Sequence, residues 1–243
     1  MPLRYTDSHC HLDWFDDPAA ITAEAQAAGV ARIVIAATTR AHWADVARCA
    51  VLPGVYASYG LHPLYQDGHQ DDDLHALESQ IQNLSTVAIG ECGLDFLNGD
   101  SAAQRATFAA QIDIARRYQL PLLLHARKSL DAVLHLLKRG GNPRFVIHSF
   151  TGSDAQLARI LAQGGYIGIG GTSTYPPATP TGDRPRRALP ARNRRARPTA
   201  LRQTGRAEPS RLYRRRRRQP RPPARRAARR HQRAKRSQRQ HLL

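Results

Sequence analysis

The residues of this chain that are best suited to metal binding or catalysis are four histidines and one glutamate that follow short apolar runs. Histidine and carboxylate side chains are the ligands that zinc, manganese and similar divalent ions take in proteins. The runs cover residues 3–7, 86–90, 121–124 and 145–147, and the residues that follow them are His9 and His11, Glu91, His125 and His148. His9 and His11 are two residues apart, so on a strand both side chains point the same way. We therefore predict a metal site built from the ends of strands.

Five such ligands are enough for two divalent ions. A carboxylate that bridges two cations lets them sit about 3.5–4 Å apart, a separation that suits phosphodiester cleavage. One ion would activate water, and the other would neutralise charge on the phosphate oxygens and the leaving group. The ligand types fit Zn²⁺, Mn²⁺ or, with more water ligands, Mg²⁺. Any one of these histidines alone would more often be a structural residue, but five ligands at strand ends favour a binuclear metal cofactor.

The elements that must position these residues alternate regularly. Short apolar segments predict seven strands near residues 3–8, 31–36, 54–59, 86–90, 121–124, 145–147 and 166–169. Longer amphipathic segments predict six helices near residues 18–28, 41–51, 72–84, 101–118, 128–139 and 153–163. Ser101, Ser129 and Ser153 are placed to cap three of the helices. Strand–helix alternation at this spacing implies a parallel sheet with right-handed crossovers.

The fold class that we predict is α/β, a (β/α)₈ TIM-type barrel that is incomplete in this chain. Seven strands and six helices make up most of such a barrel, and parallel strands in a barrel bring their C-terminal ends to one face. A doubly wound open sheet is the alternative. No glycine-rich phosphate-binding fingerprint follows the first predicted strand, which disfavours that alternative.

The composition changes abruptly near residue 180. Residues 181–243 contain 24 of the 37 Lys and Arg residues but only 2 of the 19 Asp and Glu residues, a net charge of +22. They lack Val, Ile, Phe and Trp and contain seven prolines, so they cannot bury enough apolar surface to offset the entropy of ordering. We expect two parts: a truncated hydrolase barrel in residues 1–180 and a disordered Arg- and Pro-rich tail in residues 181–243.

Cysteine usage and hydropathy indicate the compartment. The three cysteines, Cys10, Cys49 and Cys92, are an odd and sparse set that fits a reducing cytoplasm better than a disulfide framework. The N-terminus does not read as a secretory signal, and no apolar stretch reaches the roughly 20 residues of a membrane helix. We expect a cytoplasmic protein with no membrane association, and we infer no obligate protein partner.

Five stretches of this chain together resemble the TatD-type metal-dependent deoxyribonucleases and hydrolases. The stretches are DSHCHLD at residues 7–13, YGLHP at 59–63, IGECGLD at 89–95, LHAR at 124–127 and HSFTG at 148–152. The resemblance runs from residue 3 to about residue 176, and the combination of motifs is highly specific. It implies a TIM-type barrel and a binuclear metal site that acts on a DNA substrate, at a 3′ end or in single strands.

The resemblance also assigns roles to individual residues. It implies that His9, His11, Glu91, His125 and His148 are metal ligands, with Glu91 as the bridge and a catalytic residue. It implies that His62 contacts the substrate phosphate and takes part in catalysis; a structural loop histidine is the alternative. Arg127 could bind a phosphate as a bidentate hydrogen-bond donor, or it could form a surface ion pair. Asp95 could cap the loop after Glu91 or orient a histidine that binds metal.

The chain departs from this family in its last quarter. Family members carry one more ligand, an aspartate in a Glu-Thr-Asp-Ala-Pro segment that ends strand eight, and this chain lacks that segment. Codons for residues 191–198, read from the second base, permit Leu-Glu-Thr-Asp-Ala-Pro-Asp. We therefore expect a frameshift between about residues 177 and 191. We also expect the chain as written to fold poorly and to be weakly active at best.

Two other functions compete with the deoxyribonuclease interpretation. The arginine-rich tail could bind nucleic acid without sequence preference through the release of counterions, on an inactive truncated barrel. The metal site could instead hydrolyse a different ester or an amide, because a fold alone does not fix the chemistry. The first alternative predicts binding that falls steeply with salt, and the second predicts products from small esters rather than from DNA.

Overall fold

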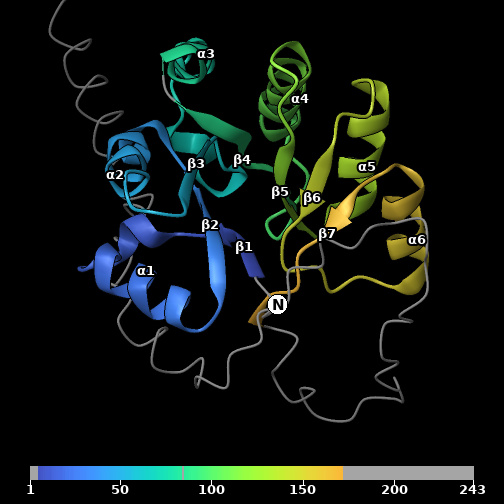
Figure 1. Cartoon of the computed structure of the whole chain (residues 1–243). Helices are drawn as coiled ribbons and strands as arrows, with labels where there is room; N and C mark the ends of the chain where they lie inside the picture. Colours follow the sequence, from blue (N-terminus) through green and yellow to red (C-terminus); the bar gives the residue numbers. More distant parts are fainter. Residues whose placement is uncertain (1–4, 84, 172–243) are drawn as a thin grey trace, which may run out of the picture.

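The computed structural model describes residues 5–83 and 85–171, so the predicted tail at residues 181–243 lies outside the described residues. Seven strands form one sheet in the order of the sequence, and each strand pairs in parallel with the next. The strands are β1 (Tyr5–Cys10), β2 (Val30–Ala36), β3 (Val55–Tyr59), β4 (Thr86–Asp95), β5 (Leu122–Arg127), β6 (Phe145–Ile147) and β7 (Tyr166–Ile167). Figure 1 shows these strands at the centre of the molecule, with helices around them.

Six helices connect the strands and lie on the outside of the sheet. They are α1 (Pro18–Ala27), α2 (Trp43–Cys49), α3 (Asp73–Asn83), α4 (Ala102–Arg117), α5 (Leu130–Arg139) and α6 (Asp154–Ala162). Three short 3₁₀ helices follow strand ends: η1 (Leu12–Trp14), η2 (Arg40–His42) and η3 (Pro63–Gly68).

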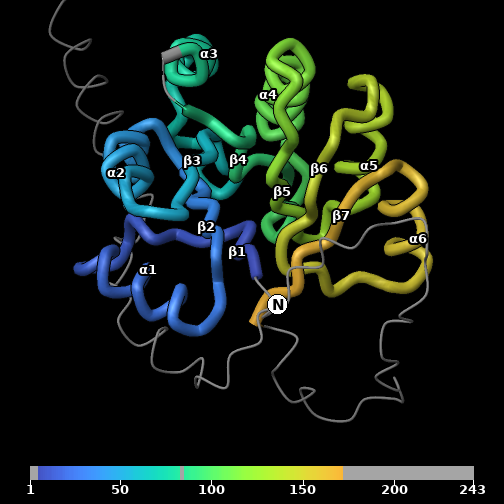
Figure 2. Tube along the Cα trace, in the orientation of Figure 1, coloured from blue at the N-terminus to red at the C-terminus, as the bar shows by residue number. Residues whose placement is uncertain are grey.

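The sheet curls into an open half-barrel. The trace in Figure 2 bends continuously from β1 to β7 with the helices outside, and no pairing joins β7 to β1 among the described residues. A doubly wound sheet would reverse its strand order at a switch point, whereas here every strand neighbours its successor. The prediction of an incomplete TIM-type barrel is therefore confirmed, with seven strands and six helices in the described part of the chain.

Three strands continue further than their apolar runs predict. β1 extends to Cys10, β4 to Asp95 and β5 to Arg127, so His9, Glu91 and His125 lie within strands rather than after them. The predicted ends at residues 8, 90 and 124 were wrong because polar residues continue the hydrogen-bonded ladder. The pairing of Gly93 with His125 is an example. By contrast, β7 is shorter than predicted and ends at residue 167 rather than 169.

Two of the three predicted helix caps are confirmed. The hydroxyls of Ser101 and Ser153 accept hydrogen bonds from the backbone N–H groups of Gln104 and Gln156, each at 3.3 Å. Ser129 occupies the cap position of α5, but its hydroxyl donates to the carbonyl of Leu94 at 2.6 Å instead. Ser129 therefore ties the start of α5 to the end of β4.

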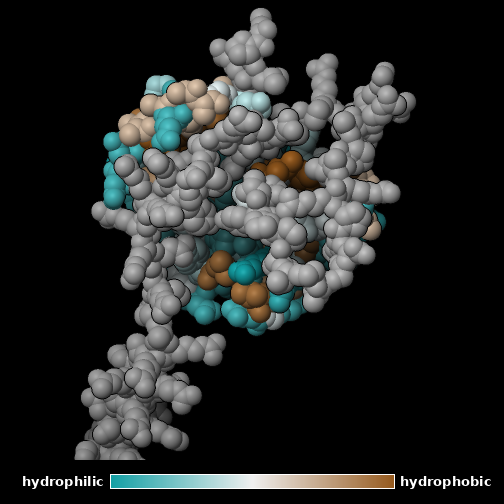
Figure 3. Space-filling view, turned by 90° about the horizontal axis from the view of Figure 1, so that it is seen from below, coloured by the Kyte–Doolittle hydropathy of each residue, from teal (hydrophilic) through white to brown (hydrophobic). Residues whose placement is uncertain are grey.

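Hydrophobic side chains gather on both faces of the sheet. The larger cluster packs the sheet against the helices and includes Ile33 and Ile35 of β2. A smaller cluster of Ala36, Ala88 and Leu123 includes the alternate positions of β2 and lies on the opposite, concave face. Figure 3 shows apolar and polar side chains intermixed on one face of the molecule. Among the described residues, no helix is both long and apolar enough to cross a membrane.

Candidate metal centre

Glu91 lies at the middle of the site because β4 changes register beside it. The pairing of β4 with β5 shifts between Ile89 and Cys92, and such irregularities re-aim side chains next to functional sites. Gly90 permits this path: its φ is +149°, and a Cβ atom there would stand 2.4 Å from the carbonyl oxygen of Leu123. The Glu91 side chain is 2% exposed, and its backbone N–H donates to the carbonyl of Ala37 at 2.9 Å.

Five histidine side chains surround the Glu91 carboxylate. They come from the C-terminal ends of β1, β3, β5 and β6, which the parallel sheet brings to one edge. Their ring nitrogens lie 2.9–3.5 Å from a Glu91 oxygen: His148 Nε2 at 2.9 Å, His125 Nδ1 at 3.1 Å, His62 Nε2 at 3.2 Å, His9 Nε2 at 3.3 Å and His11 Nε2 at 3.5 Å. The structure thus brings together all five residues predicted as metal ligands, and His62 lies with them.

Hydrogen bonds on the far side of two rings decide which nitrogen faces the centre with a lone pair. His11 Nδ1 lies 2.9 Å from the carbonyl oxygen of Ala36, which can only accept, so Nδ1 carries the proton. His125 Nε2 lies 2.8 Å from Asp95 Oδ2 and donates to that carboxylate in the same way. In their neutral forms, His11 Nε2 and His125 Nδ1 are therefore free to bind a cation. Of the two roles expected of Asp95, the contact with His125 places it behind a predicted ligand.

His62 has the opposite arrangement. The backbone N–H of Leu64 donates to His62 Nδ1 at 3.0 Å, so Nδ1 holds the lone pair and a neutral ring carries its proton on Nε2. That proton points at Glu91 Oε1, 3.2 Å away. Three ligand atoms from His62, Glu91 and His125 are near enough to hold an ion, but this tautomer makes His62 a hydrogen-bond donor instead.

The electrostatics keep the Glu91 carboxylate negative. Burial works to raise the pKa of Glu91, but the electrostatic attraction of His9 and His62 and the contacts with His11 and His125 hold that pKa well below its ordinary value. Burial lowers the pKa of His9 to about 4 against the attraction of Glu91, so this ring is neutral near pH 7. Burial also lowers the pKa of His62. For His125, burial is outweighed by the hydrogen bonds to Glu91 and Asp95, which raise its pKa.

These donors fit divalent metal ions. His9 Nε2 lies 3.3 Å from His11 Nε2, and His148 Nε2 lies 3.3 Å from His125 Nδ1, so two pairs of ring nitrogens face one another across the centre. Ligand atoms of His9, Glu91 and His148 also lie close enough together to hold one ion. A buried carboxylate with several imidazole nitrogens is a donor set that suits Zn²⁺ or Mn²⁺. Such ions, when bound, activate water and neutralise charge on phosphate oxygens.

Arg127 and Trp14 complete the surroundings of the centre. Arg127 is exposed at the end of β5, two residues after His125 and so on the same face, and it forms no ion pair with any described residue. Trp14 was not predicted from the sequence, and its ring stacks on His11 with centroids 4.1 Å apart and planes 11° apart. The signal that could have found it is its position in the short turn that directly follows the His9–His11 pair.

Comparison with known proteins agrees with this geometry. The profile of the TatD related DNase family matches residues 6–193. An *Escherichia coli* K12 protein described as the uncharacterized metal-dependent hydrolase YjjV is 38% identical over 193 residues, covering 75% of this chain and 74% of the relative. The crystal structure of YjjV, a TatD homolog from *E. coli* K12, superposes with a TM-score of 0.65 at 36% identity, covering 72% of this chain and 71% of that one.

More distant relatives carry a more specific description. A *Klebsiella pneumoniae* protein described as the 3′-5′ ssDNA/RNA exonuclease TatD is 34% identical over 156 residues, covering 62% of this chain. The chain spans 59% of that relative's length. The family match, the YjjV identity and the shared half-barrel agree with the motifs read from the sequence. This chain belongs to the TatD related DNase family of metal-dependent hydrolases.

Proposed function

We propose that this chain hydrolyses phosphodiester bonds in DNA, at a 3′ end or within single strands, with two divalent ions as cofactors. The observation that carries the proposal is the buried Glu91 carboxylate with five imidazole nitrogens 2.9–3.5 Å away. The exonuclease description of relatives that are 34–36% identical supports a nucleic-acid substrate. We assign His9, His11, Glu91, His125 and His148 as the metal ligands, with Glu91 as the bridge.

The roles of the remaining residues follow from their contacts. His62 presents its Nε2 proton to the centre and would donate it in a hydrogen bond to a phosphate oxygen of the substrate. Arg127 would hold a second phosphate oxygen, because its guanidinium is exposed, shares a face with His125 and has no described acidic partner. Asp95 positions His125 through the hydrogen bond at 2.8 Å. Such fixed donors stabilise the charge that develops on phosphate during cleavage.

Digestion of a single-stranded oligodeoxynucleotide tests the proposal. We expect cleavage that requires Mn²⁺, Zn²⁺ or Mg²⁺, stops with chelator and is lost in Glu91→Gln, with the strand label reporting the direction of digestion. The matched control is Glu78→Gln, which changes an acid that pairs with Arg117 on the surface. Cleavage that survives chelator, or turnover of small esters without any cleavage of DNA, would contradict the proposal.

A second candidate function is non-specific nucleic-acid binding by residues 181–243, and it has its own support. These residues hold 24 of the 37 Lys and Arg residues of the chain. Binding through released counterions falls steeply with salt and needs no metal. A filter-binding titration in chelator at rising salt, compared with the metal-dependent cleavage of the same strand, separates the two activities.

A further inference from the structure

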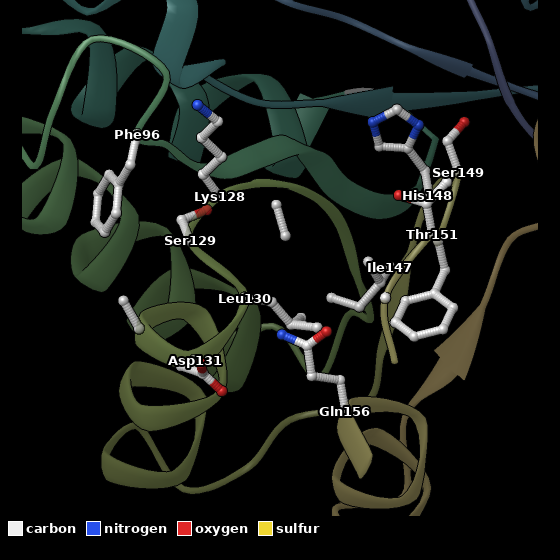
Figure 4. Close-up of a pocket in the computed structure, with 14 residues that line it drawn as sticks. Phe96, Lys128, Ser129, Leu130, Asp131, Ile147, His148, Ser149, Thr151 and Gln156 are labelled. Carbon is white, nitrogen blue, oxygen red and sulfur yellow. The ribbon is translucent and has the colours of Figure 1, made fainter. Parts of the chain in front are cut away.

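A cavity of about 460 Å³ opens beside the metal centre, between the ends of β5 and β6 and the starts of α5 and α6. His148 lines the cavity and also contacts Glu91, so the cavity adjoins the metal centre. Figure 4 shows Phe96 and Lys128 on one side of the cavity and His148 and Ser149 on the other. Its volume falls within the roughly 300–1,000 Å³ of small-molecule sites.

The charge that lines the cavity is positive. Lys128 is exposed and forms no ion pair with any residue that the structure describes. Asp131 is the acid at the cavity wall, and its carboxylate is paired with the guanidinium of Arg159. Two other cations near the same end of the barrel have acidic partners, since Arg40 contacts Asp72 at 2.8 Å and Arg105 contacts Asp100 at 2.6 Å, whereas Arg127 and Lys128 have none among the described residues. Lys128 therefore adds an unbalanced positive charge to the cavity.

Two residues of the cavity wall adopt a backbone conformation that side chains rarely take. Lys128 has φ +56° and follows β5, which carries His125, and Ser149 has φ +46° and directly follows His148. The two other described non-glycine residues with positive φ, Gln119 and Asn142, lie just after helices, where this conformation is a common ending. Unusual backbone conformations away from such endings gather at functional sites.

An aromatic ring is available in the cavity for stacking. Phe96 and Phe150 both line it and are both partly buried. The guanidinium of Arg105 lies over the ring of Phe96, 5.2 Å from its centroid. Among the described residues, no such cation lies over the ring of Phe150. Stacking on an aromatic ring tolerates any base, because every base has a π face.

We infer that this cavity binds the nucleoside that adjoins the scissile phosphodiester, with its base against Phe150 and a neighbouring phosphate on Lys128. The inference rests on the proposed function and gives it a substrate-binding site outside the ligand cluster. A single strand laid from the metal centre past His148 would enter the cavity without crossing the sheet. Recognition of this kind is independent of base sequence and depends on salt.

Photo-crosslinking locates the nucleoside without requiring turnover. The full chain is irradiated in chelator with oligonucleotides that carry 5-iododeoxyuridine at either terminal position, at a salt concentration high enough to weaken binding by the basic tail. We expect a crosslink in the peptide between Arg144 and Arg159, which contains Phe150. Crosslinks confined to residues 181–243 would overturn the inference.

A glycine variant narrows the cavity without touching a ligand. A Cβ atom on Gly152 would lie 2.6 Å from both the ring of Phe150 and the side chain of Gln156, so Gly152→Ala must displace them. We expect a loss of the crosslink of at least severalfold. Gly68→Ala is the matched control, because a Cβ atom there meets nothing within 4 Å. Equal crosslinking by both variants would overturn the inference.

A charge variant tests the phosphate contact. Lys128→Gln is compared with Lys138→Gln, which removes an exposed lysine from the end of α5 and leaves the same net charge and the same tail. For a short single strand, we expect only Lys128→Gln to lower the slope of log affinity against log salt, by about 0.7 for one lost phosphate contact. Identical slopes would overturn the assignment of Lys128.

These outcomes separate the cavity from the proposed function. A crosslink at Phe150 in a protein that cleaves no DNA would support the cavity and contradict the nuclease proposal. Metal-dependent cleavage with no crosslink in residues 145–159 would support the nuclease and overturn the cavity.

Discussion

At the scale of single residues, hydrogen bonds orient three of the five imidazoles around Glu91, whereas Nδ1 of His9 and Nδ1 of His148 are buried without a hydrogen-bond partner among the described residues. Ala36 fixes the tautomer of His11, Asp95 that of His125 and Leu64 that of His62. The spacing of His9 and His11 and the position of Glu91 after an apolar run could be read from the sequence. The tautomers could not, because a partner such as Ala36 is 25 residues away from His11 along the chain and becomes a neighbour only through folding.

Removing the charge of Asp95 should weaken the centre through His125. In Asp95→Asn, the remaining carbonyl can still accept from the backbone N–H of Leu97, but the charged contact with His125 Nε2 is lost. Loss of such an outer partner lowers metal affinity by about 10- to 100-fold, and we expect that range in a competition titration. Asp100→Asn, which changes a surface acid on the following loop, should leave the affinity unaltered. Equal affinities for the two variants would refute this role.

His62 and His125 should behave differently when removed. Because His62 Nε2 carries the proton, we expect His62→Ala to lower kcat by about 100-fold, the scale of a lost catalytic hydrogen bond or proton donor, while the bound metal is retained. His125→Ala should lose metal as well as activity. Metal analysis of the purified variants beside their turnover on DNA makes the comparison. Loss of metal from His62→Ala would identify His62 as a ligand instead.

At the scale of elements, the site depends on strand ends that an apolar pattern locates only approximately. The strands and helices followed from hydrophobic periodicity, but β4 runs past Glu91 because the ladder continues through Gly93 to Asp95. The register shift beside Glu91 depends on Gly90, whose position leaves no room for a side chain next to Leu123. That constraint comes from a neighbouring strand, so the local sequence could not reveal it.

Gln111 of α4 holds the loop that carries His62, and its loss should be costly. Its side chain accepts from the backbone N–H of Leu61 at 2.9 Å and donates to the Leu61 carbonyl at 3.1 Å, and it is fully buried. Gln111→Leu would leave these groups unpaired, and each such loss costs about 1–3 kcal/mol in the free energy of unfolding. Gln82→Leu, which changes an exposed glutamine, should stay within about 0.5 kcal/mol in a urea titration. A similarly small change in the free energy of unfolding for Gln111→Leu would contradict the proposed role of Gln111 in holding this loop.

At the scale of the whole molecule, the half-barrel brings four separate strand ends to one edge and so assembles the centre. The curl of the sheet, which brings the ends of β1 and β6 together, explains why residues as distant as His9 and His148 stack with ring centroids 4.0 Å apart. The predicted division at residue 180 and the frameshift stay proposals, since residues 172–243 lie outside the described part. They rest on the change in composition near residue 180 and on the segment that the codons for residues 191–198 permit when they are read from the second base.

Sequencing of the coding DNA across codons 170–215 tests the frameshift. We expect one base gained or lost between about codons 177 and 191, after which the frame encodes Glu-Thr-Asp-Ala-Pro and an ordinary C-terminal helix. Restoring that frame should raise the metal-dependent turnover on DNA, because the centre regains an aspartate ligand. A gene that reads as the printed sequence would contradict the proposal.

The metal content of the purified protein tests the central claim most directly. Elemental analysis after dialysis should give up to two divalent ions per chain. The bound metal should fall sharply in His9→Ala and Glu91→Gln but stay unchanged in His135→Ala, which removes an exposed histidine of α5. A buried carboxylate surrounded by imidazole nitrogens predicts this pattern. Metal content that is negligible in every protein, or equal in all four, would contradict the assignment of a metal centre at Glu91.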